Sequence, residues 1–191
     1  MRSLLPEVDF RGEKRCNVTH VSVSDPESQL YRKGEGKEAR LYFMGHVLME
    51  NRNGLVVDTR VTPATGTAER GAGLSMVADI PGGKRITIGA DKGYDYANYV
   101  AGLRSLIATP HVTTQKIKGP AIDGWTTRHA GYAVSQRKRK RVEEIFGWMK
   151  TVGWLRKARY KGEEKIDWLF TLSAAAYNMV WMRNLGIVVS G

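Results

Sequence analysis

The amino-acid sequence predicts an α/β fold in which helices flank a mixed sheet. Segments rich in β-branched and aromatic residues alternate along the chain with segments of helical periodicity. An Asn-Gly pair separates the first two β-type segments, as in a hairpin. The chain has 191 residues, of which 42 % are hydrophobic and 26 % charged. This balance is typical of one globular domain and excludes a wholly disordered chain.

The first part of the predicted domain is a β-hairpin. Residues 1–37 are polar and interrupted by prolines and glycines, so we expect an irregular segment there and a folded domain over 38–187. Residues 39–49 are rich in aromatic and large apolar side chains and predict a strand. The turn ends in Asn53-Gly54, and the β-branched residues 55–61 predict the returning strand.

The middle of the chain alternates helix and strand. Apolar residues at helical spacing predict helices over 67–78 and 96–106. Two short apolar runs predict buried strands over 85–90 and 108–114. Residues 116–134 carry no such pattern and predict a loop.

Two further helices are expected over 135–152 and about 165–185. The longest uncharged apolar stretch, from Trp168 to Met182, is shorter than the roughly 20 residues that cross a membrane. We therefore expect a buried helix there and no membrane partner.

The charge of the chain points to a polyanionic partner. Lys and Arg number 30 against 19 Asp and Glu, which gives a formal charge of +11 and a pI near 9.9. Nucleic acid is the commonest partner of so basic a chain, and a merely soluble surface is the alternative. The single cysteine, Cys16, excludes an internal disulfide framework and a Cys-based zinc site. It fits a reducing cytoplasm, with the nucleoid as the site of action.

Asp91 is the first candidate site residue because it directly follows a predicted buried strand. Ligands of open α/β sheets bind beyond the carboxyl ends of the strands, and a carboxylate there can hold a divalent metal. Gly93 allows a sharp turn after it. The alternative is that Asp91 only caps that turn.

The helix over 135–152 carries the second candidate. Arg139, Glu143, Gly147 and Lys150 follow one stripe of this helix, so an acid stands between two bases. Arg and Lys side chains can hold phosphates while the Glu carboxylate binds a cation that polarises the same phosphodiester. The alternative is an ordinary surface ion pair between Arg139 and Glu143.

A basic run and a second basic cluster predict nucleic-acid binding. Residues 137–141 are five consecutive Lys or Arg, and further bases follow among Trp148, Trp154 and Tyr160. Lys and Arg side chains neutralise phosphates, and aromatic rings stack on unpaired nucleobases. A solvated charged face would show the same run of charges. The candidate DNA-binding residues are Arg137, Arg139, Arg141, Lys150, Arg156 and Lys157.

These motifs resemble those of DDE transposases from bacterial insertion sequences. Arg139, Glu143 and Lys150 match the R-x3-E-x6-K part of the Y-R-E-K signature, and Gln136 stands where that signature has Tyr. Four further stretches are similar to the same family, in the same order along the chain: 45–58, 64–70, 89–95 and 174–178.

The resemblance implies an RNase H-like domain in which three carboxylates hold two Mg²⁺ ions, or Mn²⁺, for DNA cleavage and strand transfer. It implies that Asp91 is the second carboxylate and Glu143 the third, and that both are metal ligands. It also implies that Arg139 and Lys150 contact the DNA of the insertion-sequence ends or target. Homo-oligomers are a further expectation.

The family's first catalytic Asp lies on a central strand upstream of the hairpin, and no matching stretch is present here. Asp9 and Asp58 are the nearest substitutes. We therefore expect an N-terminally truncated domain that lacks its central first strand and is inactive alone. The hairpin and the strand before Asp91 would then each lack a neighbour. The alternative function is a non-catalytic, basic DNA-binding remnant that interferes with intact transposase.

Overall fold

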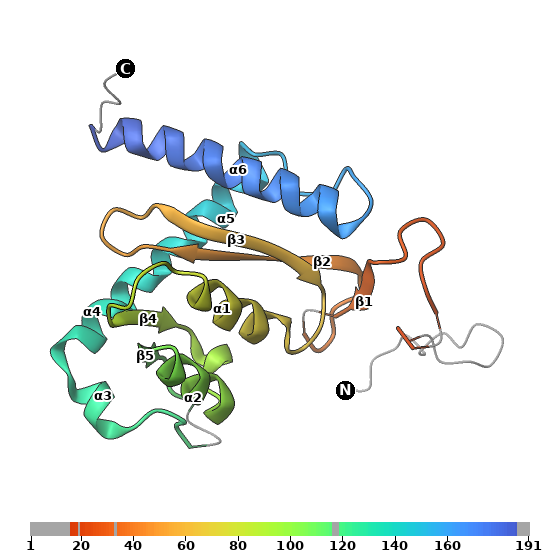
Figure 1. The fold of residues 1–191 in the computed structure, drawn as a ribbon. Coiled ribbons are helices and arrows are strands. Elements are labelled where there is room, and N and C mark those ends of the chain that lie inside the picture. The colour runs from red at the N-terminus through yellow and green to blue at the C-terminus, as the bar shows by residue number, and fades with distance from the viewer. Residues whose placement is uncertain (1–15, 19, 33, 116–118, 187–191) are drawn as a thin grey trace.

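The computed structural model describes residues 16–18, 20–32, 34–115 and 119–186. Its strands form two separate sheets (Figure 1). The first is antiparallel, in the order β1 (Gln29–Tyr31), β2 (Arg40–Met49) and β3 (Val56–Pro63). The second consists of β4 (Ile86–Ala90) and β5 (Ala108–Val112), which run parallel.

Six α-helices surround these sheets in the described part of the chain. Two short 3₁₀ helices, η1 and η2, follow β4 and α4 respectively. The helices are α1 (Ala68–Ala78), η1 (Lys92–Tyr94), α2 (Ala97–Ser105), α3 (Gly124–Arg128), α4 (Ala130–Lys138), η2 (Arg139–Arg141), α5 (Val142–Thr151) and α6 (Glu163–Asn184).

The hairpin turn is fixed by one carboxylate. Glu50 accepts hydrogen bonds from the backbone N–H of Arg52 at 2.7 Å and of Asn53 at 2.6 Å. Gly54 has φ +80°, a conformation that side chains other than glycine rarely adopt. Trp181 of α6 donates its indole N–H to the Asn53 carbonyl at 2.5 Å, so the turn is also held from the C-terminal helix.

The first core lies between α6, α5 and β3, which run close together in Figure 1. Polar side chains of α6 add bonds to the β3 backbone: Asn178 both accepts from Val56 N at 2.8 Å and donates to Val56 O at 2.9 Å. The buried residues of this core are Val61, Ile145, Met149, Ile166, Phe170, Ala174 and Tyr177.

The second core holds β4 and β5 against α2. Leu103 of α2 is fully buried, and its neighbours are mostly small or β-branched. The buried residues of this core are Val77, Ala90, Tyr99, Val100, Leu103, Ala108 and Val112. The two sheets thus pack against separate cores.

The order of elements predicted from the hairpin to β5 is confirmed, and so are the α/β class and the C-terminal helix α6. The described strands form an antiparallel and a parallel sheet, because β2 and β4 belong to different sheets and no described strand lies between them. Residues 116–134, predicted as a loop, contain α3 and the start of α4. The expected irregular segment contains the short strand β1, while residues 1–15, 19 and 33 lie outside the described part.

Gly45 tests the packing of α6 on the hairpin. A Cβ at Gly45 would stand 2.6 Å from two ring atoms of the buried Phe170, so the ring or the strand would have to move. We expect Gly45→Ala to lower the free energy of unfolding by about 1–3 kcal/mol in chemical denaturation.

Gly71→Ala is the matched control. Gly71 lies in α1, where a Cβ would meet nothing within 4 Å. This variant should raise the free energy of unfolding by up to about 1 kcal/mol, because alanine favours the helix. Equal effects of the two substitutions would contradict the packing described here.

Candidate functional site

Asp91 stands at the carboxyl end of β4, where the sequence placed it. Its carboxylate caps η1, since Oδ1 accepts from Gly93 N at 2.7 Å. A Cβ on Gly93 would lie 3.0 Å from that oxygen, which explains the glycine. The capping role is therefore confirmed. The side chain is exposed, and the cap does not use Oδ2, so a ligand role remains open to it.

The helical segment α4–η2–α5 connects the two sheets (Figure 1). It begins beside the carboxyl end of β5, where Tyr132 donates its hydroxyl to Val112 O at 2.9 Å. Gln136 then donates to His111 O at 2.6 Å and accepts from Thr113 Oγ1 at 2.5 Å. Farther along, α5 packs into the first core against α6.

The segment touches β4 at Gly89. A Cβ built there would stand 3.5 Å from Arg139 Cβ and 3.6 Å from Ser135 O, so the helix lies directly on the strand. Asp91 follows two residues later on the strand side, and Glu143 follows four residues after Arg139 on the helix side. The structure thus brings α4 and η2, the segments that directly precede the helix of Glu143, into contact with the strand that ends at Asp91.

The helix predicted over 135–152 is interrupted by η2, and this was not anticipated. A 3₁₀ helix advances 120° per residue against 100° in an α-helix, so three residues turn everything after them by about 60°. The predicted stripe of Arg139, Glu143, Gly147 and Lys150 is therefore not a straight line on one helix.

Arg139 and Glu143 do not form an ion pair among the described residues. Arg139 is half-buried and donates instead to Gln136 Oε1 at 2.9 Å, while Glu143 is exposed. The alternative of an ordinary surface pair is therefore wrong. Through this bond Gln136 joins Arg139 to the end of β5.

The predicted DNA-binding residues fall into two groups. Arg137, Lys150, Arg156 and Lys157 are exposed. Arg141 is half-buried and donates to the carbonyl oxygens of Asn51 at 3.4 Å and Arg52 at 3.1 Å, which ties η2 to the hairpin turn.

Sequence reasoning missed the polar residues that support this region. Asp95 is only 7 % exposed and accepts from the backbone N–H of Gln115 at 2.6 Å and of Ala121 at 2.9 Å. His111 is also buried, and burial and the nearby His129 lower its pKa. The only signal for Asp95 was its place in the stretch 89–95.

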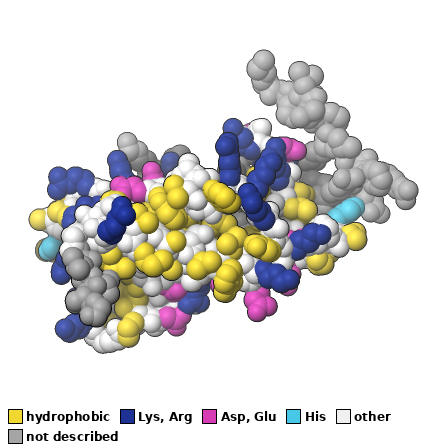
Figure 2. Space-filling view, turned by 90° about the horizontal axis from the view of Figure 1, so that it is seen from above, with side chains coloured by type: hydrophobic (Ala, Val, Ile, Leu, Met, Phe, Trp, Pro, Cys, Tyr) yellow, Lys and Arg dark blue, Asp and Glu magenta, His cyan; other side chains and the backbone are white. Residues whose placement is uncertain are grey.

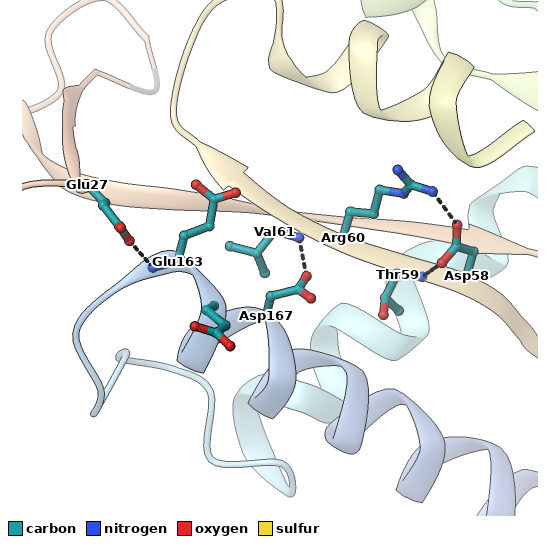
Figure 3. Close-up of a pocket in the computed structure, with 8 residues that line it drawn as sticks. Glu27, Asp58, Thr59, Arg60, Val61, Glu163 and Asp167 are labelled. Carbon is teal, nitrogen blue, oxygen red and sulfur yellow. Dashed lines mark hydrogen bonds and ion pairs between the residues drawn. The ribbon is translucent and has the colours of Figure 1, made fainter. Parts of the chain in front are cut away.

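A hollow of about 610 Å³ lies elsewhere, between the start of α6 and β3 (Figure 3). Its carboxylates serve the backbone: Asp167 accepts from Val61 N at 2.7 Å, and Glu27 accepts from Glu163 N at 2.5 Å. Burial, together with the charges of Glu27 and Asp167, raises the pKa of Glu163 above its usual 4.5. The carboxylates that line the hollow, called the acidic seam below, thus hold the start of α6 in place.

Three metal-binding carboxylates are not found together in the described residues. No group of three or more His, Cys, Asp or Glu side chains there could hold a metal ion. Asp91 and Glu143 supply at most two ligands. The donor set is therefore incomplete for a two-metal centre of three carboxylates.

Comparison with protein families identifies the chain. The model of the transposase DDE domain family matches residues 17–179. The chain belongs to this family. It has no significant match among the curated proteins or among the solved structures.

Membership in the DDE transposase family points to DNA cleavage and transfer in transposition, with DNA as the partner. The family generally uses divalent metal ions. None of the helices described for this transposase domain combines the length and apolar composition needed to cross a membrane.

Glu163 gives a pH-dependent test of the acidic seam. Its raised pKa means that ionisation of Glu163 destabilises the folded state. This destabilisation is present at neutral pH and disappears as the pH falls below the ordinary carboxyl pKa of 4.5. We expect Glu163→Gln to raise the melting temperature at pH 7 and to leave it unchanged at strongly acidic pH.

Glu164→Gln is the control, because Glu164 also stands in the first turn of α6 and shares the favourable interaction of an acid with the helix N-terminus. Thermal unfolding followed by circular dichroism should show Glu163→Gln as the more stable variant at pH 7. A lower melting temperature for Glu163→Gln than for Glu164→Gln would contradict the crowding of charge at the seam.

Proposed function

We propose that this chain is the part of an insertion-sequence DDE transposase that carries the second and third catalytic carboxylates, Asp91 and Glu143. The contact of Arg139 and Ser135 with Gly89 is the observation that carries the proposal. It sets α4 and η2, which directly precede the helix of Glu143, against the strand that ends at Asp91. The match to the Y-R-E-K signature supports the same assignment, with Gln136 in place of Tyr.

The two carboxylates have the properties of metal ligands. Both side chains are exposed, and the Asp91 cap leaves Oδ2 unused. Carboxylate oxygens are the ligands that Mg²⁺ and Mn²⁺ prefer. We propose that Asp91 and Glu143 together hold one such ion weakly.

The first carboxylate would come from outside the described residues. The separate sheets support this idea, because β2 and β4 each have one side without a described strand neighbour over most of their length. An RNase H-like domain has its first strand at this place, and the first catalytic Asp lies on it. We therefore propose that the chain alone does not cleave DNA.

The exposed Lys and Arg side chains would hold the DNA backbone. Arg137, Lys150, Arg156 and Lys157 can each neutralise a phosphate, whereas Arg139 would contact DNA only with its half-buried side chain. Arg141 already ties η2 to the hairpin turn, so its DNA contact would be secondary.

A non-catalytic, DNA-binding remnant is the second candidate function. The incomplete set of metal ligands among the described residues favours this function, because Lys and Arg side chains can retain DNA without a metal centre. Such a chain could interfere with intact transposase by occupying the DNA ends.

Calorimetric titration with MgCl₂ tests the metal pair. We expect weak binding by the natural chain and none by Asp91→Asn or Glu143→Gln, because each variant removes half of the ligand set. The double variant should equal either single one, as expected for two groups of one site. Glu144→Gln, an exposed neighbour of Glu143, should retain the binding. Mg²⁺ heats that survive both single substitutions would reject the shared site.

A retention and nicking assay on supercoiled plasmid DNA distinguishes an active enzyme from a chain that only binds DNA. We expect the chain to retain the plasmid but not to nick it with Mg²⁺ or Mn²⁺. Nicking that disappears in Glu143→Gln would show that the chain is active alone. Retention of the plasmid by a chain that binds no Mg²⁺ would support the second candidate function, a non-catalytic DNA-binding remnant.

The salt dependence of retention tests the basic residues. Each phosphate contact contributes about 0.9 to the slope of log K against log salt concentration. Arg137→Ala and Lys157→Ala should each lower the slope by about that amount. Lys84→Ala should not, since Lys84 is exposed near the amino end of β4, away from Asp91. A slope lowered equally by all three would indicate binding through net charge alone.

A further inference from the structure

The outer face of α6 is apolar although nothing described covers it. Trp168 is 65 % exposed, Leu172 48 % and Met179 63 %. With the exposed Ala175 they stand at i, i+4, i+7 and i+11, which places them in one stripe along the helix. Figure 2, which looks down on this side of the molecule, shows hydrophobic side chains gathered across the face over α6.

This stripe is separate from the face that packs on the molecule itself. The inner face of α6 is already buried against β3 and α5, through Ile166, Phe170, Ala174 and Tyr177. A helix that is apolar on both sides needs two partners, and a contiguous exposed apolar stripe marks an interaction surface.

Opposite charges stand at the two ends of the stripe. Glu164 lies four residues before Trp168, and Arg183 lies four residues after Met179. Both are exposed, and neither forms an ion pair with another described residue. The stripe therefore runs from an acid through four apolar side chains to a base.

The spacing makes the stripe complementary to itself in the antiparallel direction. If two copies of α6 lie antiparallel, with the twofold axis level with the midpoint of Ser173 and Ala174, Glu164 faces the partner's Arg183. Trp168 then faces the partner's Met179, and Leu172 faces the partner's Ala175. Each pair occurs twice because the interface is isologous.

The paired side chains suit one another. A thioether against an indole ring is a favourable contact, and a large residue against a small one lets facing layers interdigitate. A parallel arrangement in the same register would set Glu164 against Glu164 and Arg183 against Arg183. Charge thus selects the antiparallel direction.

We propose that α6 is a homodimer interface, in which two copies of this chain pack antiparallel through Trp168, Leu172, Ala175 and Met179, with Glu164–Arg183 ion pairs at both ends. The proposal does not depend on the metal pair or on DNA binding. It specifies the partner as a second copy and fixes the register of the contact.

Charge reversal in the full chain tests the register. Sedimentation equilibrium over a range of concentrations should show a dimer for the natural chain. Glu164→Lys and Arg183→Glu should each raise the dimer Kd about tenfold or more, because two ion pairs become two repulsive contacts. The double variant E164K/R183E restores opposite charges and should return to within about threefold of the natural Kd. Circular dichroism and thermal unfolding confirm that each variant folds.

Trp168→Glu tests the apolar stripe, since it places a charge in each half of the interface. It should give a monomer at concentrations where the natural chain is dimeric. Trp125→Glu is the control, because Trp125 is 83 % exposed on α3 and lies outside the stripe. A monomer at every concentration would overturn the proposal, and so would a dimer whose Kd is unmoved by either charge reversal or by Trp168→Glu.

Discussion

The candidate site depends on the close contact between Gly89 of β4 and the helix at Arg139 and Ser135. A Cβ would just fit there, but a longer side chain would extend into the space of Arg139. Gln136 holds the same helix to the carboxyl end of β5 through His111 O and Thr113. Neighbouring contacts thus hold α4 and η2 against β4 and β5, just before Glu143 in the chain and beside the strand that ends at Asp91.

The C-terminal helix fixes the other half of the molecule. Asn178 and Asp167 bond the backbone of β3, Phe170 packs against Gly45, and Trp181 reaches the hairpin turn. Arg141 ties that turn to η2, so the hairpin and the helix of Glu143 are placed together. One face of α6 therefore organises the domain, and its apolar outer face stays exposed.

Much of the architecture could be predicted because the signals were local. Asn53-Gly54 specified the turn, apolar periodicity specified the helices, and the strand before Asp91 ended where the apolar run did. The break at η2 could not be predicted, since no proline or glycine marks it. The ties made by Gln136 and Arg141 depend on tertiary contacts. Such features leave no pattern in a single sequence.

The most direct test of the account is the distance between the two carboxylate positions. Spin labels at Lys92 and Glu144, beside Asp91 and Glu143, can be measured by pulsed electron paramagnetic resonance in a Cys16→Ser background. We expect one narrow distribution below about 25 Å, well inside the roughly 40 Å diameter of a compact domain of this size. Gly89→Leu should lengthen or broaden it. A distance near the full diameter, unchanged by Gly89→Leu, would contradict the proposed pairing of Asp91 with Glu143.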